Sequence, residues 1–152
     1  MPTQAADGVF ADTNVWVNAA VLTAPRRAQA IAAVGRPATG ALWTSRQVVR
    51  EFLAVMSRPQ TFFPGNAPMS DILNRARMIE SQCRVAEDGP DVAQQLHDLL
   101  AVGDTRGKQI HDANIVATML AHGIRTLLTD NGNDFARWGA LHRGPGPVAS
   151  LR

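Results

Sequence analysis

Acidic side chains that tend towards the protein interior are the first chemical signal in this sequence. Asp112 precedes Ile115 and Val116 by three and four residues, so it shares the apolar face of a helix. Glu51 lies on the flank of a similar face, and Asp12 directly follows an apolar segment. Two buried carboxylates about 4 Å apart repel by about 4 kcal/mol at an effective dielectric constant of about 20. We therefore expect a positively charged partner between these acids.

A divalent metal ion is the partner that the rest of the composition favours. Lys108 is the sole lysine, and no two of the four histidines stand at metal-ligand spacing. Carboxylate oxygens are the ligands that Mg²⁺ and Mn²⁺ prefer. The sequence therefore predicts an oxygen-lined site for Mg²⁺ or Mn²⁺.

Each acid also has an ordinary structural interpretation. Asp12 could cap a loop, and Asp112 could stabilise the first turn of its helix through the helix macrodipole. Glu51 could pair with Arg50 on the solvated surface. All of these interpretations must hold together for the acidic site to be absent, which favours the metal-site hypothesis.

Strands that alternate with helices are expected to position the acids. Strands are predicted at 9–11, 41–44, 84–86 and 124–129. Helices are predicted at 15–22, 25–34, 48–56, 72–79, 92–100 and 110–121. Pro25 should open the second helix, and Ser45 and Ser70 are the expected N-caps of the third and fourth. This alternation predicts an α/β sandwich in which helices flank a central, mainly parallel sheet.

One edge of that sheet should carry the functional site. Open α/β sheets bind ligands beyond the carboxyl ends of their strands. Asp12 follows the first predicted strand and Asp130 follows the last, so both are expected at this edge.

Length and composition indicate a single domain. The chain has 152 residues, of which 45% are hydrophobic, enough for a core without disulfides. We expect one domain over 1–152, with irregular tails at 1–8 and 144–152. The first residues lack a signal-peptide pattern, and no apolar run approaches the roughly 20 residues that span a membrane. Cys83 is the sole cysteine, so we expect a buried thiol, no internal disulfide and a cytoplasmic protein.

The basic residues are almost all arginine. The formal net charge is only +2, but every basic residue except Lys108 is an arginine. Arginine binds phosphate in a bidentate manner, which favours a nucleic-acid partner, although a bias in codon usage would give the same composition. Arg46 and Arg50, one turn apart on the helix of Glu51, are the candidate phosphate contacts; the alternative is a solvated helix face.

Four motifs, in their order and spacing, resemble the PIN-domain ribonuclease family. They are Val9–Val15 (VFADTNV), Gln47–Phe52 (QVVREF), His111–Thr118 (HDANIVAT) and Leu127–Phe135 (LLTDNGNDF). Together they extend over nearly the whole chain. Short single-domain members of this family are VapC-type toxins of type II toxin–antitoxin systems, and the chain is similar to these.

The resemblance implies a PIN-like nuclease fold and hydrolysis of RNA phosphodiesters with Mg²⁺ or Mn²⁺. The catalytic and metal-binding acids would be Asp12, Glu51, Asp112 and, as the favoured fourth acid, Asp134. The supporting residues would be Thr13, Asn14, Thr129, Asp130 and Asn131.

Further expectations follow from the same resemblance. Asp130 or Asn131 could take the fourth acidic position in place of Asp134. Arg46 and Arg50 would bind RNA phosphates outside the acidic pocket. The implied partners are an RNA substrate, a cognate antitoxin and a second copy of the chain, with no membrane.

Several other sites are excluded. The sequence has no P-loop, no nucleophile elbow and no HExxH motif. The segment after Asp130 is not an EF-hand, because its glycine comes too early and Leu141 stands at the position of the bidentate glutamate. Asn131-Gly132 could also form a tight hairpin turn.

Two other functions stay open. A catalytically weak PIN-like module would only bind RNA or a protein. An aspartyl-phosphate phosphotransfer domain centred on Asp12 is less favoured. It is opposed by Asn14, where such a site needs a second aspartate, and by the position of Lys108 in a polar loop.

Overall fold

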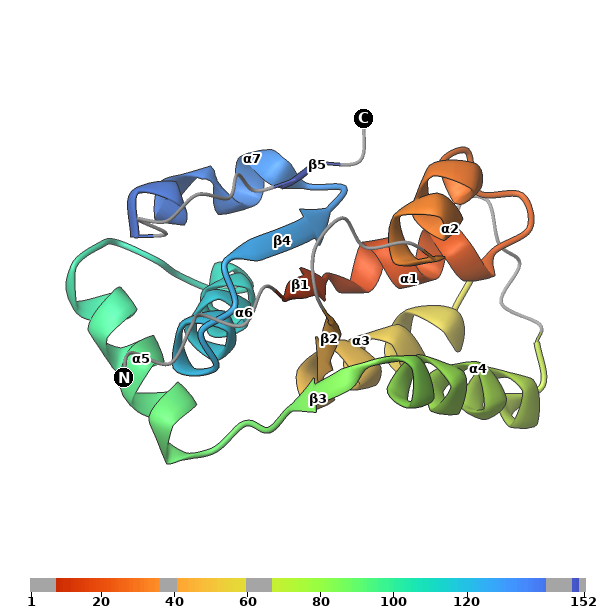
Figure 1. Cartoon of the computed structure of the whole chain (residues 1–152), viewed down its shortest axis with the longest axis horizontal. Coiled ribbons are helices and arrows are strands. Elements are labelled where there is room, and N and C mark those ends of the chain that lie inside the picture. Colours follow the sequence, from red (N-terminus) through yellow and green to blue (C-terminus); the bar gives the residue numbers. More distant parts are fainter. Residues whose placement is uncertain (1–7, 36–40, 60–66, 142–148, 151–152) are drawn as a thin grey trace.

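A five-stranded parallel sheet lies at the centre of the fold (Figure 1). The computed structural model describes residues 8–35, 41–59, 67–141 and 149–150. The strands are β1 (Val9–Ala11), β2 (Leu42–Ser45), β3 (Arg84–Ala86), β4 (Thr126–Thr129) and β5 (Ala149–Ser150). Their order in the sheet is β3-β2-β1-β4-β5, and every pairing is parallel. The predicted α/β architecture is therefore confirmed.

Most of the other described segments are helices, and they cover this sheet. They are α1 (Thr13–Ala20), α2 (Arg27–Gly35), α3 (Arg46–Met56), α4 (Met69–Gln82), α5 (Pro90–Ala101), α6 (Gln109–Ala121) and α7 (Gly132–Phe135), with a 3₁₀ helix at Ala136–Leu141. In Figure 1, α1 to α4 gather at one end of the molecule, whereas α5 and α6 lie at the other. α1 packs against α2 and α3, α3 packs against α4, and α5 packs against α6.

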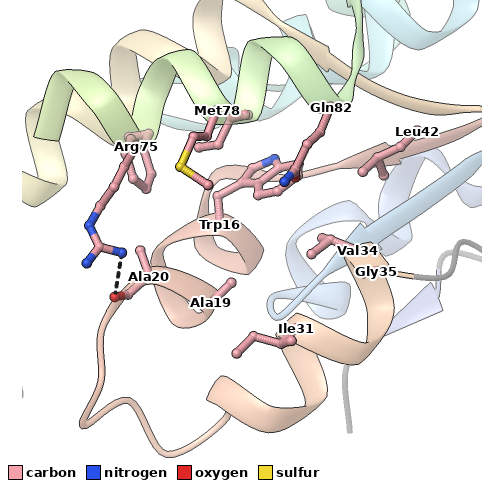
Figure 2. Close-up of a pocket in the computed structure, with 12 residues that line it drawn as sticks. Trp16, Ala19, Ala20, Ile31, Val34, Gly35, Leu42, Arg75, Met78 and Gln82 are labelled. Atoms are coloured by element: carbon pink, nitrogen blue, oxygen red, sulfur yellow. Dashed lines mark hydrogen bonds between the residues drawn. The ribbon is translucent and has the colours of Figure 1, made fainter. Parts of the chain in front are cut away.

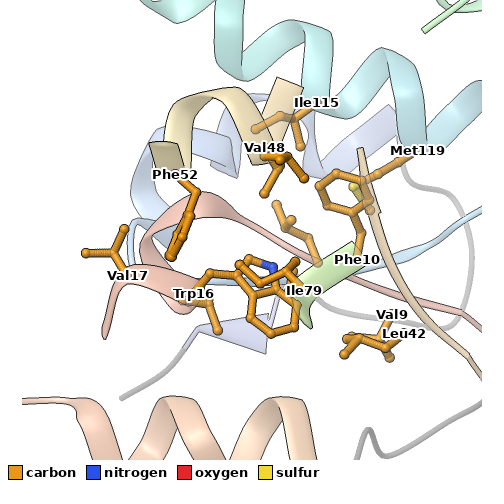
Figure 3. Close-up of a cluster of buried hydrophobic side chains, with 14 of the residues drawn as sticks. Val9, Phe10, Trp16, Val17, Leu42, Val48, Phe52, Ile79, Ile115 and Met119 are labelled. Atoms are coloured by element: carbon orange, nitrogen blue, oxygen red, sulfur yellow. The ribbon is translucent and has the colours of Figure 1, made fainter. Parts of the chain in front are cut away.

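The central strand explains the position of the core. All three residues of β1 are buried, as expected for a parallel strand that is covered on both faces. Phe10 of this strand lies among Val48 and Phe52 of α3 and Ile115 and Met119 of α6 (Figure 3). The apolar faces that the sequence places on these two helices therefore meet over β1.

Several predicted element ends are confirmed and others move. Ser45 caps α3, because its Oγ accepts a hydrogen bond from the backbone N–H of Val48 at 3.3 Å. The prediction that Ser70 caps the next helix is wrong. The carbonyl of Pro68 already accepts hydrogen bonds from Asp71 and Ile72, so α4 begins at Met69.

Two other boundaries also differ from the prediction. Pro25 precedes α2 rather than opening it, because the helix begins at Arg27. Ile124 lies outside β4, since its N–H donates to the carbonyl of Met119 in α6 at 2.9 Å. Gly123 makes this reversal possible with φ at +70°, a value that favours glycine.

The C-terminal region requires two corrections. The segment after β4 is the short helix α7, and β4 has no antiparallel partner among the described residues, so the hairpin interpretation of Asn131-Gly132 is wrong. The expected irregular tail at 144–152 is wrong at Ala149–Ser150, where β5 pairs with the free edge of β4. The rest of that tail and residues 1–7, 60–66 lie outside the described residues.

Candidate active site

Acidic side chains from four segments line one open cavity of about 880 Å³. They are Asp12, Glu51, Asp112, Asp130 and Asp134. The cavity lies at the carboxyl ends of β1 and β4, the edge at which parallel sheets bind ligands. The first and last of these acids, Asp12 and Asp134, are more than 120 positions apart in the sequence and line the same cavity.

Asp12 is the most enclosed of these acids, with 6% of its surface exposed. It is the N-cap of α1, and its Oδ1 accepts a hydrogen bond from the N–H of Thr13 at 2.8 Å. Its Oδ2 accepts a hydrogen bond from the hydroxyl of Thr129 at 2.9 Å. Because β1 and β4 are neighbours in the sheet, the chain brings Thr129 to Asp12 directly.

Glu51 is held by donors from two helices. Its Oε2 accepts a hydrogen bond from the hydroxyl of Thr13 at 2.7 Å, and its Oε1 accepts one from Nε2 of Gln47 at 2.9 Å. Gln47 also donates to the carbonyl of His111 at 2.8 Å and accepts from Nδ2 of Asn114 at 2.8 Å. This buried amide therefore orients Glu51 and connects α3 to α6.

Burial and mutual repulsion raise the pKa of two of the acids. Burial raises the pKa of Asp12 to about 6, against the opposing effect of the hydrogen bonds from Thr13 and Thr129. Burial also raises the pKa of Asp112 to about 6, with further contributions from the negative charges of Asp134 and Glu51. A cation between these carboxylates would relieve this repulsion.

The donor chemistry of the cavity fits a hydrated divalent cation. No three His, Cys, Asp or Glu side chains in the described part of the chain are close enough to hold a metal ion directly. Mg²⁺, however, keeps several water ligands and takes only one or two carboxylates from the protein. A pair of these acids together with water supplies such an oxygen-only set.

The loop after β4 is fixed to α1. The backbone N–H of Asp130 donates to Oδ1 of Asn14 at 3.0 Å, and the N–H of Asn131 donates to the hydroxyl of Thr129 at 3.1 Å. Asn14 Nδ2 also lies 3.4 Å from that hydroxyl, to which it donates. Asp130 Oδ1 lies 2.6 Å from Nη1 of Arg26, which forms an ion pair with it. Asp130 is thus a paired acid, unlike Asp134, which is exposed.

The structure brings most of the predicted site residues together. All four predicted catalytic acids line the cavity, as do Thr13, Asn14, Asp130 and Asn131. Arg46 and Arg50 are not among the described residues that line it. Arg46 instead pairs with Glu80 at 2.8 Å and with Glu87 at 2.9 Å.

Sequence reasoning missed several residues of the site. Arg26, Arg58 and Lys108 are the basic residues that line the cavity, and none was selected for this role. Gln47 could have been found, because it precedes Glu51 by four residues and so faces it on one helix. Arg26 carried no such signal, since it precedes its helix and reaches the site through tertiary packing.

A second cavity, of about 650 Å³, lies between α1, α2 and α4 (Figure 2). It is mostly apolar, and Ile31 and Met78 at its margin are 41% and 58% exposed. At one end of it, Arg75 of α4 donates a hydrogen bond from Nη1 to the carbonyl of Ala20 in α1 at 3.2 Å. No acid lines this cavity in the described residues, so it is suited to apolar contacts rather than hydrolysis.

Two further properties bear on function. Burial raises the pKa of the half-buried Cys83 thiol to about 12, so it stays protonated at neutral pH and is a poor nucleophile.

Within the described ranges, every helix is too short or too polar to cross a bilayer.

Comparisons with known proteins agree with this architecture. The family profile described as the PIN domain matches residues 9–141. Among solved structures, VapC20 from Mycobacterium tuberculosis, a sarcin-ricin loop cleaving toxin, is similar with a TM-score of 0.66 and 21% identity over 85% of this chain and 94% of that one. VapBC2 from Rickettsia felis, bound to a promoter DNA fragment, gives a TM-score of 0.58 and 16% identity over 86% of this chain and 92% of that one. A search of curated proteins finds no match. The profile spans most of the chain, and the chain belongs to the PIN domain family.

Proposed function

We propose that this protein is a metal-dependent endoribonuclease and the toxin component of a toxin–antitoxin pair. The observation that carries the proposal is the shared cavity of Asp12, Glu51, Asp112 and Asp134, in which two carboxylates have pKa values raised to about 6. Crowded acids of this kind are stabilised by a divalent cation, which many nucleases use for phosphodiester hydrolysis. Membership of the PIN domain family supports the same reaction.

The side chains of the cavity divide the work. Asp12, Glu51, Asp112 and Asp134 would hold Mg²⁺ or Mn²⁺, a pair of them directly and the others through water ligands. When bound, such an ion lowers the pKa of water and offsets the charge of the phosphate. Thr13 donates to both Asp12 and Glu51, which fixes the two carboxylates relative to each other.

Asp112 is the acid that we assign to orienting the attacking water. Its carboxylate is only half-buried, so it could accept a hydrogen bond from the attacking water and still contact solvent. Thr129 orients Asp12 from β4, while Asn14 and Asn131 are supporting residues because both bond to that hydroxyl.

The partners that we propose are supported by a structural neighbour and by the surfaces of the protein. The similar Rickettsia felis structure is a VapBC assembly, which supports an antitoxin for this chain as well. The apolar cavity of Figure 2, with Ile31 and Met78 exposed, is a surface that a protein partner would cover. A segment of the antitoxin would also cover the acidic cavity. The protein would form a homodimer. It would act on RNA in the cytoplasm.

The test of this proposal is cleavage of a structured RNA in the presence of Mn²⁺. Asp12→Asn removes the central carboxylate with little change in shape and should abolish cleavage, as should EDTA with the wild type. Asp91→Asn is the matched control, because Asp91 is exposed in the first turn of α5 and does not line the cavity. Wild-type cleavage by Asp12→Asn would defeat the proposal.

Two alternatives give different results. A PIN-like binding module would show no carboxylate-dependent uptake of Mn²⁺ in a calorimetric titration. An aspartyl-phosphate domain would bind beryllofluoride in the presence of Mg²⁺. The second is disfavoured because Asn14 lines the cavity with Asp12 at the position where such a domain needs a second aspartate.

A further inference from the structure

Arg26 is the most firmly placed cation at the acidic cavity. It lies just before α2, and its side chain, 30% exposed, lines the cavity next to the acids. Its Nη1 lies 2.6 Å from Oδ1 of Asp130, whose side chain is 22% exposed. Asp130 Oδ1 accepts no well-aligned hydrogen bond in the described part of the chain. The attraction between the two charges therefore holds Arg26 and Asp130 together.

The partner of Arg26 is itself fixed to the helix that begins beside Asp12. Asp130 Oδ2 accepts a hydrogen bond from Nδ2 of Asn18 at 3.5 Å, and its backbone N–H donates to Oδ1 of Asn14 at 3.0 Å. Both asparagines belong to α1. The guanidinium therefore has a defined position relative to Asp12.

The other part of the Arg26 guanidinium has unused hydrogen-bonding capacity. Its Nη2 is shielded from solvent and has no hydrogen-bond partner among the described residues. A buried donor without an acceptor is unstable, so this group gains a bond when a ligand, with a small shift of the side chain, brings an acceptor to it. The cavity itself supplies that ligand's route of entry.

Phosphate is the acceptor that this arrangement suits. A planar guanidinium binds phosphate oxygens with two parallel N–H donors, and a carboxylate on one edge orients it for contact on the other. Arg58 and Lys108 also line the cavity but are exposed, so they attract phosphate without the same constraint.

We infer that Arg26, oriented by Asp130, binds a backbone phosphate of the RNA next to the phosphate that is cleaved. Asp130 is then a positioning residue rather than a metal ligand, and Asp134 is the fourth acid of the site. This inference rests on the proposed ribonuclease function.

The salt dependence of RNA binding tests the inference directly. In an Asp12→Asn background, which should not cleave, we would measure binding of a short fluorescein-labelled single-stranded RNA of mixed sequence between about 50 and 200 mM salt. Loss of one phosphate contact lowers the slope of log affinity against log salt by about 0.7 for single strands. Arg26→Gln should show this decrease and bind several-fold more weakly.

Variants that keep a cation at position 26 separate phosphate binding from a structural role. Arg26→Lys and Asp130→Asn both keep the positive charge at the cavity, so both should keep the wild-type slope. Arg84→Gln is the matched control for net charge, because Arg84 is not among the described residues that line the cavity. It lies at the start of β3, with its guanidinium 5.8 Å from the ring centre of Trp43. It should leave the slope unchanged.

The outcomes distinguish this inference from the proposed function. If RNA is cleaved by the wild type but Arg26→Gln keeps the full slope, Arg26 only pins the loop after β4 and the inference is overturned. If the wild type neither binds nor cleaves RNA, the proposed function fails as well. With Asp12 intact, a rise in KM with kcat retained in Arg26→Gln would support the phosphate contact.

Discussion

At the scale of single residues, Thr13 is the link between Asp12 and Glu51. Its backbone N–H donates to Asp12 and its hydroxyl donates to Glu51, so one residue fixes carboxylates that come from α3 and from the start of α1. The residue is buried, with 8% of its surface exposed, and a change in its side chain would act on this geometry rather than on solvent contacts.

Thr13→Val should therefore lower both activity and stability. Valine matches the shape of threonine but removes the donor to Glu51, and a hydrogen bond to a charged group contributes about 1.5–3 kcal/mol. If that bond acts in the transition state, kcat/KM should fall about tenfold to a hundredfold. RNA cleavage and thermal unfolding of the same preparations measure the two effects.

Thr13→Ser is the control, because it keeps the hydroxyl. It should retain most of the activity, whereas equal activity of the valine variant and the wild type would show that the bond to Glu51 is dispensable.

The acids themselves could be predicted from the sequence, but their pairing could not. Asp12 and Asp112 are recognisable because they stand where apolar patterns point inward. The pairing of Arg46 with Glu80 and Glu87, and of Arg26 with Asp130, depends on contacts between distant segments. No local pattern records such contacts.

At the scale of elements, the buried amide of Gln47 joins α3 to α6. It donates to Glu51 and to the carbonyl of His111, and it accepts from Asn114, so its hydrogen-bonding groups are used in both directions. A network of this kind is stable only when all its members are paired.

Gln47→Leu should destabilise the protein and weaken Mn²⁺ binding together. The variant leaves the carbonyl of His111 and the amide of Asn114, both in part-buried hydrogen bonds, without this partner, which costs up to about 1–3 kcal/mol per group. Denaturant unfolding and calorimetric titration with Mn²⁺ provide the two measurements.

Gln94→Leu is a close control for this change. Gln94 also donates to an acid four residues later, Asp98, at 2.9 Å, but the pair is exposed on α5. Its loss should change stability by less than about 0.5 kcal/mol. Similar destabilisation by both substitutions would contradict the role given to the Gln47 network.

Element types were easier to predict than element ends. The order of strands and helices follows from apolar periodicity, and the cap at Ser45 follows from its chemistry. The starts of α4 and of β4 depend instead on which carbonyl accepts a particular N–H. The carbonyls of Pro68 and Met119 accept these hydrogen bonds. The preference of serine for the N-cap position, applied to Ser70, did not predict the start of α4.

At the scale of the whole molecule, the acidic site couples stability to pH and, on the proposed function, to metal. The pKa of Asp12 is about 6 in the folded protein and 3.8 in its ordinary state, so the folded protein binds the proton more tightly. The stability from this group is fully present below about pH 4 and is lost as pH rises through about 6. The raised pKa corresponds to a loss of roughly 3 kcal/mol at most.

Without metal, wild-type protein should therefore lose stability relative to Asp12→Asn as the pH rises from about 4 to about 8. Mn²⁺ should reverse this loss in the wild type at high pH, because it binds the ionised carboxylates. Unfolding in denaturant with EDTA or Mn²⁺, at several pH values, measures both effects. A stability difference that is independent of pH would contradict the assigned burial of the Asp12 charge.

The hydrogen bond between Asp12 and Thr129 joins positions 117 residues apart in the sequence. During translation, Asp12 emerges from the ribosome long before the strand that carries Thr129. A nascent chain that ends before β4 therefore has its acids but lacks one of the two donors that orient Asp12. On the proposed function, catalytic competence should accordingly arise late in synthesis, after β4 has emerged.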